Sequence, residues 1–120
     1  MKSIFIAGSR KFFDEMEHLL GKLRAAGINA NTAGKWDRTK EDTFEGEQNA
    51  LKTAFRHIDE SDVCYVYAKE GYIGKTVAME IAYAHARGKE IVSSETLQEL
   101  PARSLVTKVL EPEQLIEYCK

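Results

Sequence analysis

The sequence is poor in cysteine, in long apolar segments and in excess charge, and each of these absences excludes some classes of protein. Only two of the 120 residues are cysteines. Cys64 lies in an apolar segment and Cys119 lies next to the C-terminus, without the CxxC spacing of redox or metal sites. We therefore interpret both as reduced thiols in a reducing compartment, and we do not expect a catalytic cysteine.

The chain also has no apolar run long enough to cross a membrane and no N-terminal segment that resembles a signal peptide. We therefore expect a cytoplasmic protein with no membrane partner. Its 17 basic and 19 acidic residues are intermixed and give a net charge of −2, which implies no general attraction to nucleic acid polymers. Any phosphate group must be held by a local site.

The composition is that of an ordinary globular protein. With 43% hydrophobic and 30% charged residues, the chain is neither disordered nor membranous. At 120 residues it can build one core but not two, so we expect a single domain over residues 1–120. There is no internal repeat or low-complexity segment.

Strand and helix periods alternate along the chain. Apolar runs indicate strands at residues 3–7, 28–30, 63–67 and 91–92, with a fifth strand within 105–110. Helical spacing indicates helices at about residues 12–26, 50–58 and 75–87, and a last helix with Pro112 in its first turn. The polar stretch 31–47 is interpreted as a long loop. This alternation predicts a Rossmann/flavodoxin-like three-layer α/β sandwich with a mainly parallel sheet in the order 2-1-3-4-5.

In this strand order, two turns lie side by side at the carboxyl ends of strands, where such sheets bind ligands. In the first turn, Gly8 permits close approach, Ser9 offers a hydroxyl and Arg10 a charged fork, which together suit an anion. The alternative, that Ser9 only caps a helix and Arg10 is solvated, stays open.

The second turn, residues 71–76, ends in Gly74-Lys75-Thr76 and so resembles a phosphate-binding P-loop. That motif requires a glycine five positions before Gly74, where this chain has Lys69, so we do not expect a nucleoside triphosphatase. Gly71, Tyr72 and Gly74 remain candidate substrate-binding residues, although a turn tyrosine exposed to solvent is an equally good interpretation of Tyr72.

Glu80 is the best candidate for a catalytic group. On a helix it shares a face with small and apolar neighbours, and it lies near the positive end of the helix dipole. A carboxylate in this position would be partly desolvated yet could stay ionised as a nucleophile. The alternative is a surface glutamate on an amphipathic helix.

Three segments carry a family resemblance. The sequence from Phe5 to Arg10, the strand entry Ser61-Asp62-Val63, and the helix containing Glu80-Ile81-Ala82-Tyr83-Ala84 together resemble the nucleoside 2-deoxyribosyltransferase superfamily. That superfamily includes 2′-deoxynucleoside 5′-phosphate N-hydrolases, and the resemblance in element order covers about residues 3–93. Its most specific part is the helix of Glu80.

The resemblance implies that Glu80 attacks C1′ of a deoxyribose and displaces the base, after which water or a second base takes the sugar. It also implies that Gly8, Ser9 and Arg10 hold a 5′-phosphate, and that Phe5 stands where relatives often have a tyrosine near the sugar. No cofactor is implied. Analogy with oligomeric relatives predicts a homo-oligomer.

The chain departs from the family pattern at two positions. Six residues before the nucleophile, relatives carry aspartate or serine and this chain has Gly74; eight residues before Asp62, Ala54 replaces an expected aspartate. Candidates for the acid that protonates the base are Glu70, Asp37 and Asp42.

Other conspicuous residues add little to this assignment. Trp36 could stack on a base, pack in a subunit interface or anchor the loop, and the three histidines lack metal-ligand spacing, so we expect no metal. Two functions remain: an N-glycosidase or deoxyribosyltransferase acting on a nucleoside or, as Arg10 favours, its 5′-monophosphate, and a non-catalytic nucleotide-binding domain. The cytokinin-activating phosphoribohydrolases are disfavoured because their Gly-Gly-x-Gly-Thr-x-x-Glu spacing is not met.

Overall fold

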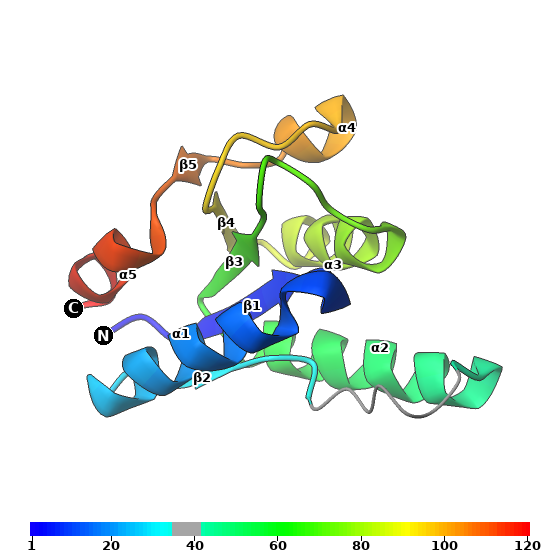
Figure 1. Cartoon of the computed structure of the whole chain (residues 1–120), viewed down its shortest axis with the longest axis horizontal. Helices are drawn as coiled ribbons and strands as arrows, with labels where there is room; N and C mark the ends of the chain where they lie inside the picture. Colours follow the sequence, from blue (N-terminus) through cyan, green and yellow to red (C-terminus); the bar gives the residue numbers. More distant parts are fainter. Residues whose placement is uncertain (35–41) are drawn as a thin grey trace.

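The computed structural model describes residues 1–34 and 42–120, and a five-stranded sheet lies at its centre (Figure 1). All strands are parallel, in the order β2-β1-β3-β4-β5. The strands are β1 (Ile4–Gly8), β2 (Ala30–Asn31), β3 (Val63–Tyr67), β4 (Glu90–Ser93) and β5 (Lys108–Val109). The predicted α/β class and strand order are therefore confirmed.

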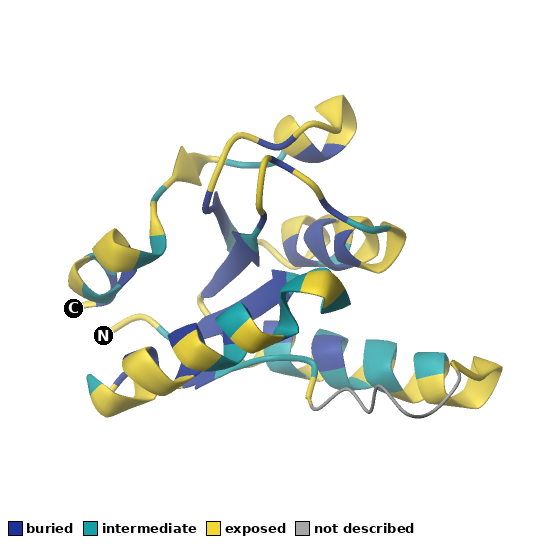
Figure 2. Ribbon diagram, in the orientation of Figure 1, coloured by how far each residue is buried: buried dark blue, intermediate teal, exposed yellow. Residues whose placement is uncertain are grey.

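Helices cover both faces of this sheet. On one face lie α1 (Phe13–Ala25) and α5 (Pro112–Cys119), and on the other lie α2 (Phe44–Asp59), α3 (Lys75–Ala86) and the short α4 (Leu100–Arg103). Figure 2 shows the result: the strands β1, β3 and β4 are buried, and each long helix turns an exposed side outward. This is the predicted three-layer arrangement.

The strands β1 and β3 carry no charged residue because both of their faces are covered. Successive side chains point to opposite faces of a strand, so Ile4 and Ile6 pack on the side of α1, whereas Phe5 and Ala7 pack on the side of α2 and α3. Each of these four residues is at most 1% exposed. The candidate site residues after β1 are therefore attached to a strand that is held firmly in the core.

Local signals explain where the helices begin and end. A 3-10 turn, η1 (Arg10–Phe12), precedes α1 and is capped by Ser9, whose hydroxyl accepts from the amide of Lys11. At the end of α3 the amide of Gly88 donates to His85 and that of Lys89 to Ala84, the Schellman arrangement. The last helix begins with Pro112, as predicted, behind a reciprocal capping box of Glu111 and Gln114.

The structure corrects the sequence prediction at several boundaries. Residues 44–47 belong to α2 rather than to the preceding loop, because Thr43 caps the helix by accepting from the amide of Gly46. The second strand is Ala30–Asn31 rather than 28–30, the fifth is only Lys108–Val109, and α4 was not predicted at all. In each case the true element is short or begins with a polar turn, which leaves no apolar period to detect.

Both cysteines are free and buried, and burial raises the pKa of each thiol. Over residues 1–34 and 42–120, no helix has the length and apolar character needed to span a bilayer.

Candidate functional site

A cavity of about 330 Å³ opens at the carboxyl end of β1, between α1, α2 and α3. Phe5, Gly8, Ser9 and Arg10 come from β1 and the turn that follows it, and Gly74 and Glu80 come from the start of α3. Six of the residues singled out in the sequence, far apart along the chain, thus line one cavity. Further lining comes from α1, α2 and the segment after β2, including Phe13, Glu17, Thr32, Ala33, Asp42, Glu47 and Ala50.

Glu80 lies in the second turn of α3, and only 4% of its surface is exposed. Val77 and Ala84, which share its face, belong to the core that anchors α3 to the sheet. Burial raises the pKa of Glu80 from its ordinary value of 4.5 to about 7, although the nearby charge of Arg10 acts in the opposite direction. Near neutral pH, the cavity therefore holds a carboxyl group that can readily gain or lose a proton.

Arg10 is already paired with two carboxylates. Its Nη1 lies 2.7 Å from Oδ1 of Asp42, and its Nη2 lies 2.5 Å from Oε1 of Glu47. Although partial burial lowers the pKa of Arg10, hydrogen bonds and charge from Glu47 and Asp42 raise it overall. The fork thus ties the turn after β1 to the first turn of α2.

The turn of Gly8 and Ser9 is tightly packed. A Cβ atom on Gly8 would lie 2.5 Å from Sδ of Met16 and 3.0 Å from the carbonyl oxygen of Tyr67, so a side chain there would disturb α1 and β3. Ser9 both caps η1 and lines the cavity. Below them, the fully buried ring of Phe5 stacks against His57, with centroids 6.5 Å apart.

Gly71 and Tyr72 lie outside the residues that line the cavity. Gly71 has φ +78°, and a Cβ atom there would lie 2.4 Å from the carbonyl oxygen of Thr96, so glycine is needed for close packing against the loop after β4. Tyr72 is 37% exposed and contacts the ring of Phe12 and the ammonium group of Lys11. The structure gives both residues packing roles.

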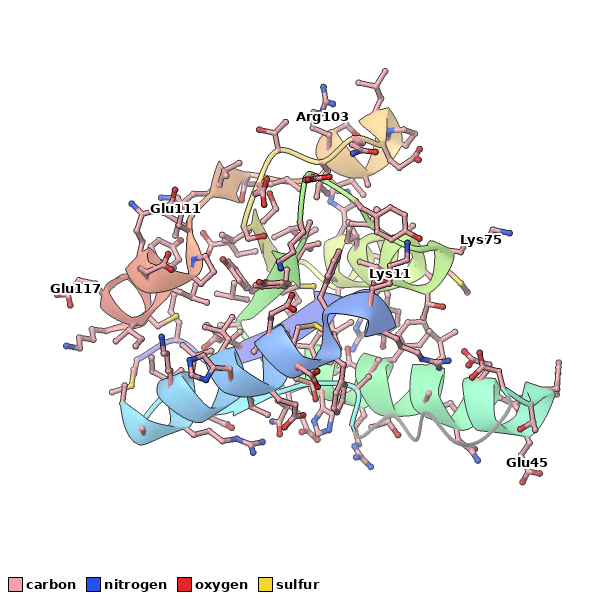
Figure 3. The ribbon with its side chains drawn as sticks, viewed as in Figure 1. Lys11, Glu45, Lys75, Arg103, Glu111 and Glu117 are labelled. Atoms are coloured by element: carbon pink, nitrogen blue, oxygen red, sulfur yellow. The ribbon has the colours of Figure 1, made fainter. Side chains whose placement is uncertain are left out.

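Gly74 is the N-cap of α3 and contributes no capping side chain. A Cβ atom at this position would have no neighbour within 4 Å, so the space beside Gly74 is open. The next residue, Lys75, is exposed, and its side chain extends away from the ribbon in Figure 3.

Of the two suggested proton donors that the structure describes, Asp42 and Glu70, Asp42 lines the cavity. Glu70 lies outside the lining, where its amide donates to Glu95 and its carbonyl accepts from Gln98. Asp37 lies outside the described residues, as does Trp36. Ala54, at the other position that departs from the family pattern, is fully buried in α2.

Sequence reasoning missed two acids that line the cavity, Glu17 and Glu47. Glu47 shares a helix face with Ala50 and Ala54, a spacing that could have found it once Thr43 was recognised as a cap. Glu17 lies one turn after Phe13 on the cavity side of α1. Among the residues that the structure describes, no three His, Cys, Asp or Glu side chains form a group that could hold a metal ion.

No protein-family model matches the sequence, and no curated protein matches it significantly. Solved structures do share the fold. A 2-deoxyribosyltransferase from Bacillus psychrosaccharolyticus superposes with a TM-score of 0.69 at 17% identity, covering 97% of this chain and 91% of that one. A conserved protein of Enterococcus faecalis V583 gives 0.65 at 18% identity, covering 98% and 96% of the two chains.

A CMP N-glycosidase from Clostridium botulinum gives a TM-score of 0.63 at 17% identity, again covering 98% of this chain and 96% of that one. Agreement over nearly the full length of each protein supports the resemblance found in the sequence. The chain therefore shares the fold of these three proteins.

Proposed function

We propose that this protein cleaves the N-glycosidic bond of a deoxynucleoside or its 5′-monophosphate, or transfers the deoxyribosyl group, with Glu80 as the nucleophile. The observation that carries the proposal is the buried carboxyl group of Glu80, which lines a cavity at the ligand-binding edge of a parallel sheet. The names of two similar structures, a 2-deoxyribosyltransferase and a CMP N-glycosidase, describe reactions at the same kind of bond.

The reaction would proceed in two displacements. The Glu80 carboxylate attacks C1′, a C1′–O bond forms, and the electron pair of the C1′–N bond leaves with the base, which takes up a proton. The sugar carries positive charge in the transition state, and a buried carboxylate stabilises that charge. Water, or the nitrogen of a second base, then attacks C1′ and releases Glu80 as a carboxylate.

The residues around Glu80 support the other roles. Phe5 offers an apolar wall to the sugar ring, and Gly8 and Ser9 bring backbone and a hydroxyl to the same cavity. Among the described residues, the acids that line the cavity besides Glu80 are Asp42, Glu47 and Glu17. We propose that the proton for the departing base comes from this group or from water.

A second candidate, a non-catalytic nucleotide-binding domain, is favoured by one observation. Gly74 leaves open the space where relatives place a polar side chain, so the set of groups around Glu80 is reduced. Such a domain would bind the same ligands in the same cavity without turnover.

The test follows the release of free base from a panel of 2′-deoxynucleosides and their 5′-monophosphates. We expect release by the native protein and a loss of at least roughly a thousandfold in Glu80→Gln, because the amide cannot form the glycosyl ester. The matched control is Glu45→Gln, the same chemical change at an exposed carboxylate whose side chain points away from the fold in Figure 3. Ligand binding without turnover would favour the non-catalytic domain, and release that persists in Glu80→Gln would refute the role of Glu80.

A further inference from the structure

The described wall of the cavity is acidic, and this charge bears on which substrate can bind there. Where the structure describes it, its charged side chains are the cations Arg10 and Lys75 and the acids Glu17, Asp42, Glu47 and Glu80. Lys75 is exposed and turned outward (Figure 3), so of these two cations Arg10 is the one built into the wall. Among the lining residues within 1–34 and 42–120, the acids therefore outnumber the cations.

Arg10 itself is neutralised by its partners. The two terminal nitrogens of its fork point at two different carboxylates, at 2.7 Å and 2.5 Å, which is the geometry of strong charge-assisted hydrogen bonds. A phosphate dianion that reached the fork would either displace Asp42 or Glu47 or accept from the other N–H groups of Arg10, and in both cases it would lie beside at least one of these carboxylates. Like charges at such distances repel, more strongly in a partly buried site than in water.

A 5′-hydroxyl meets no such conflict. It can donate to a carboxylate oxygen and accept from a guanidinium nitrogen, so it can join the existing network without breaking either ion pair. The sequence alone favoured a 5′-monophosphate because Arg10 was counted without its partners. The ion pairs of Arg10 argue against that preference.

We infer that Asp42 and Glu47 are specificity-determining residues, which hold Arg10 in ion pairs and select an uncharged nucleoside over its 5′-monophosphate. This inference rests on the proposed function and identifies its substrate class. The two acids also hold the start of α2 against the turn after β1, because Asp42 directly precedes the cap Thr43 and Glu47 lies in the first turn of the helix. The same contacts thus shape one wall of the cavity and set its charge.

The test compares kcat/KM for a 2′-deoxynucleoside and its 5′-monophosphate in the native protein, Asp42→Asn, Glu47→Gln and the double variant. The amides keep an oxygen that can accept from Arg10, and thermal unfolding of each variant checks the fold. We expect the native protein to prefer the nucleoside. In the double variant, the ratio of monophosphate to nucleoside activity should rise at least about tenfold, equivalent to roughly 1.4 kcal/mol.

Two controls separate this effect from a general change in charge. Glu45→Gln removes the same charge two residues before Glu47 on an exposed side of α2 and should leave the ratio unchanged. Adding Arg10→Gln to the double variant should abolish the gain, because the guanidinium that no longer faces these two carboxylates is what would bind the phosphate. If the acids acted only by holding the fold, removing Arg10 would not reverse the change in the activity ratio.

Equilibrium binding of the same two ligands, measured by calorimetry, keeps the inference separable from catalysis. Native preference for the monophosphate, or a ratio that changes no more in the double variant than in Glu45→Gln, overturns the inference and leaves Glu80-dependent turnover standing. The expected change in binding ratio without any turnover supports the inference and contradicts the enzyme. Binding of neither ligand overturns both.

Discussion

Glu80 combines burial with access to a ligand cavity, and its protonation should control the reaction. Only the carboxylate can attack C1′, and burial raises the pKa of Glu80 to about 7. We therefore expect kcat/KM to increase about tenfold per pH unit below neutrality and to level off above about pH 7. The measurement is a pH–rate profile with a deoxynucleoside. A flat profile across this range would contradict the assigned role.

The same residue should make stability depend on pH. Because the pKa of Glu80 is raised on folding, from 4.5 to about 7, the native state binds its proton more tightly than the unfolded state does. Its contribution is present in full below pH 4.5 and is lost as the pH rises to about 7, a change of roughly 3 kcal/mol.

Urea unfolding at several pH values measures this effect, with Glu80→Gln as the neutral reference. The stability of the native protein relative to the variant should fall between pH 4.5 and 7. A constant difference between the two proteins would show that Glu80 is not desolvated in the fold.

Arg10 shows the limit of sequence reasoning at the scale of one residue. Gly8-Ser9-Arg10 could be placed beside the helix of Glu80 because each segment follows a buried strand, and the structure lines one cavity with both. The partners of Arg10 come 32 and 37 residues later, from a stretch with no apolar period. No local pattern could have paired them.

Among the connecting elements, the turn between β3 and α3 is fixed by packing against the loop after β4. We expect Gly71→Ala to destabilise the protein by roughly 2 kcal/mol or more, because it adds both an unfavourable positive φ and a clash with the carbonyl group of Thr96. Chemical denaturation measures the loss. The carbonyl of Gly71 also accepts from the amide of Gln98, so the clash would disturb a paired backbone contact.

Gly88→Ala provides the matched comparison. Gly88 has φ +73° at the end of α3, but a Cβ atom there would meet nothing within 4 Å. The Gly88→Ala variant should therefore lose only the backbone contribution to its free energy of unfolding, about 1 kcal/mol. Equal losses in the two variants would contradict the packing role given to Gly71.

The accuracy of the element predictions follows the strength of the local signals. The strand at residues 63–67 was placed at its observed bounds because five consecutive apolar residues are covered on both faces. The first turn of α2 was missed because its exposed residues carry no apolar stripe and only the cap at Thr43 marks its start. The edge strands β2 and β5 have two residues each, too few for any period to show.

In the molecule as a whole, the topology brings the site together. Because β1 lies between β2 and β3, the turn after β1 faces the start of α3 on one side and the start of α2 on the other. The predicted strand order is confirmed, and it places the cavity at the expected edge. The contact between α2 and the turn depends on residues distant in sequence, which is why it emerged only from the fold.

Assembly and cellular location stay predictions at this scale. The exposed apolar residues are scattered over several elements and include Phe44 at the start of α2, which is 86% exposed. Sedimentation at several protein concentrations would test the expected homo-oligomer, and a monomer at all concentrations would contradict it.

The central claim is that Glu80 becomes covalently attached to the sugar, and peptide mapping by mass spectrometry tests it most directly. The protein is mixed with a deoxynucleoside, quenched in acid within the first turnovers and digested. We expect a mass increase of one deoxyribosyl group on the peptide that carries Glu80, and none in Glu80→Gln. Release of base without an adduct on that peptide, at an undiminished rate in Glu80→Gln, would contradict the account.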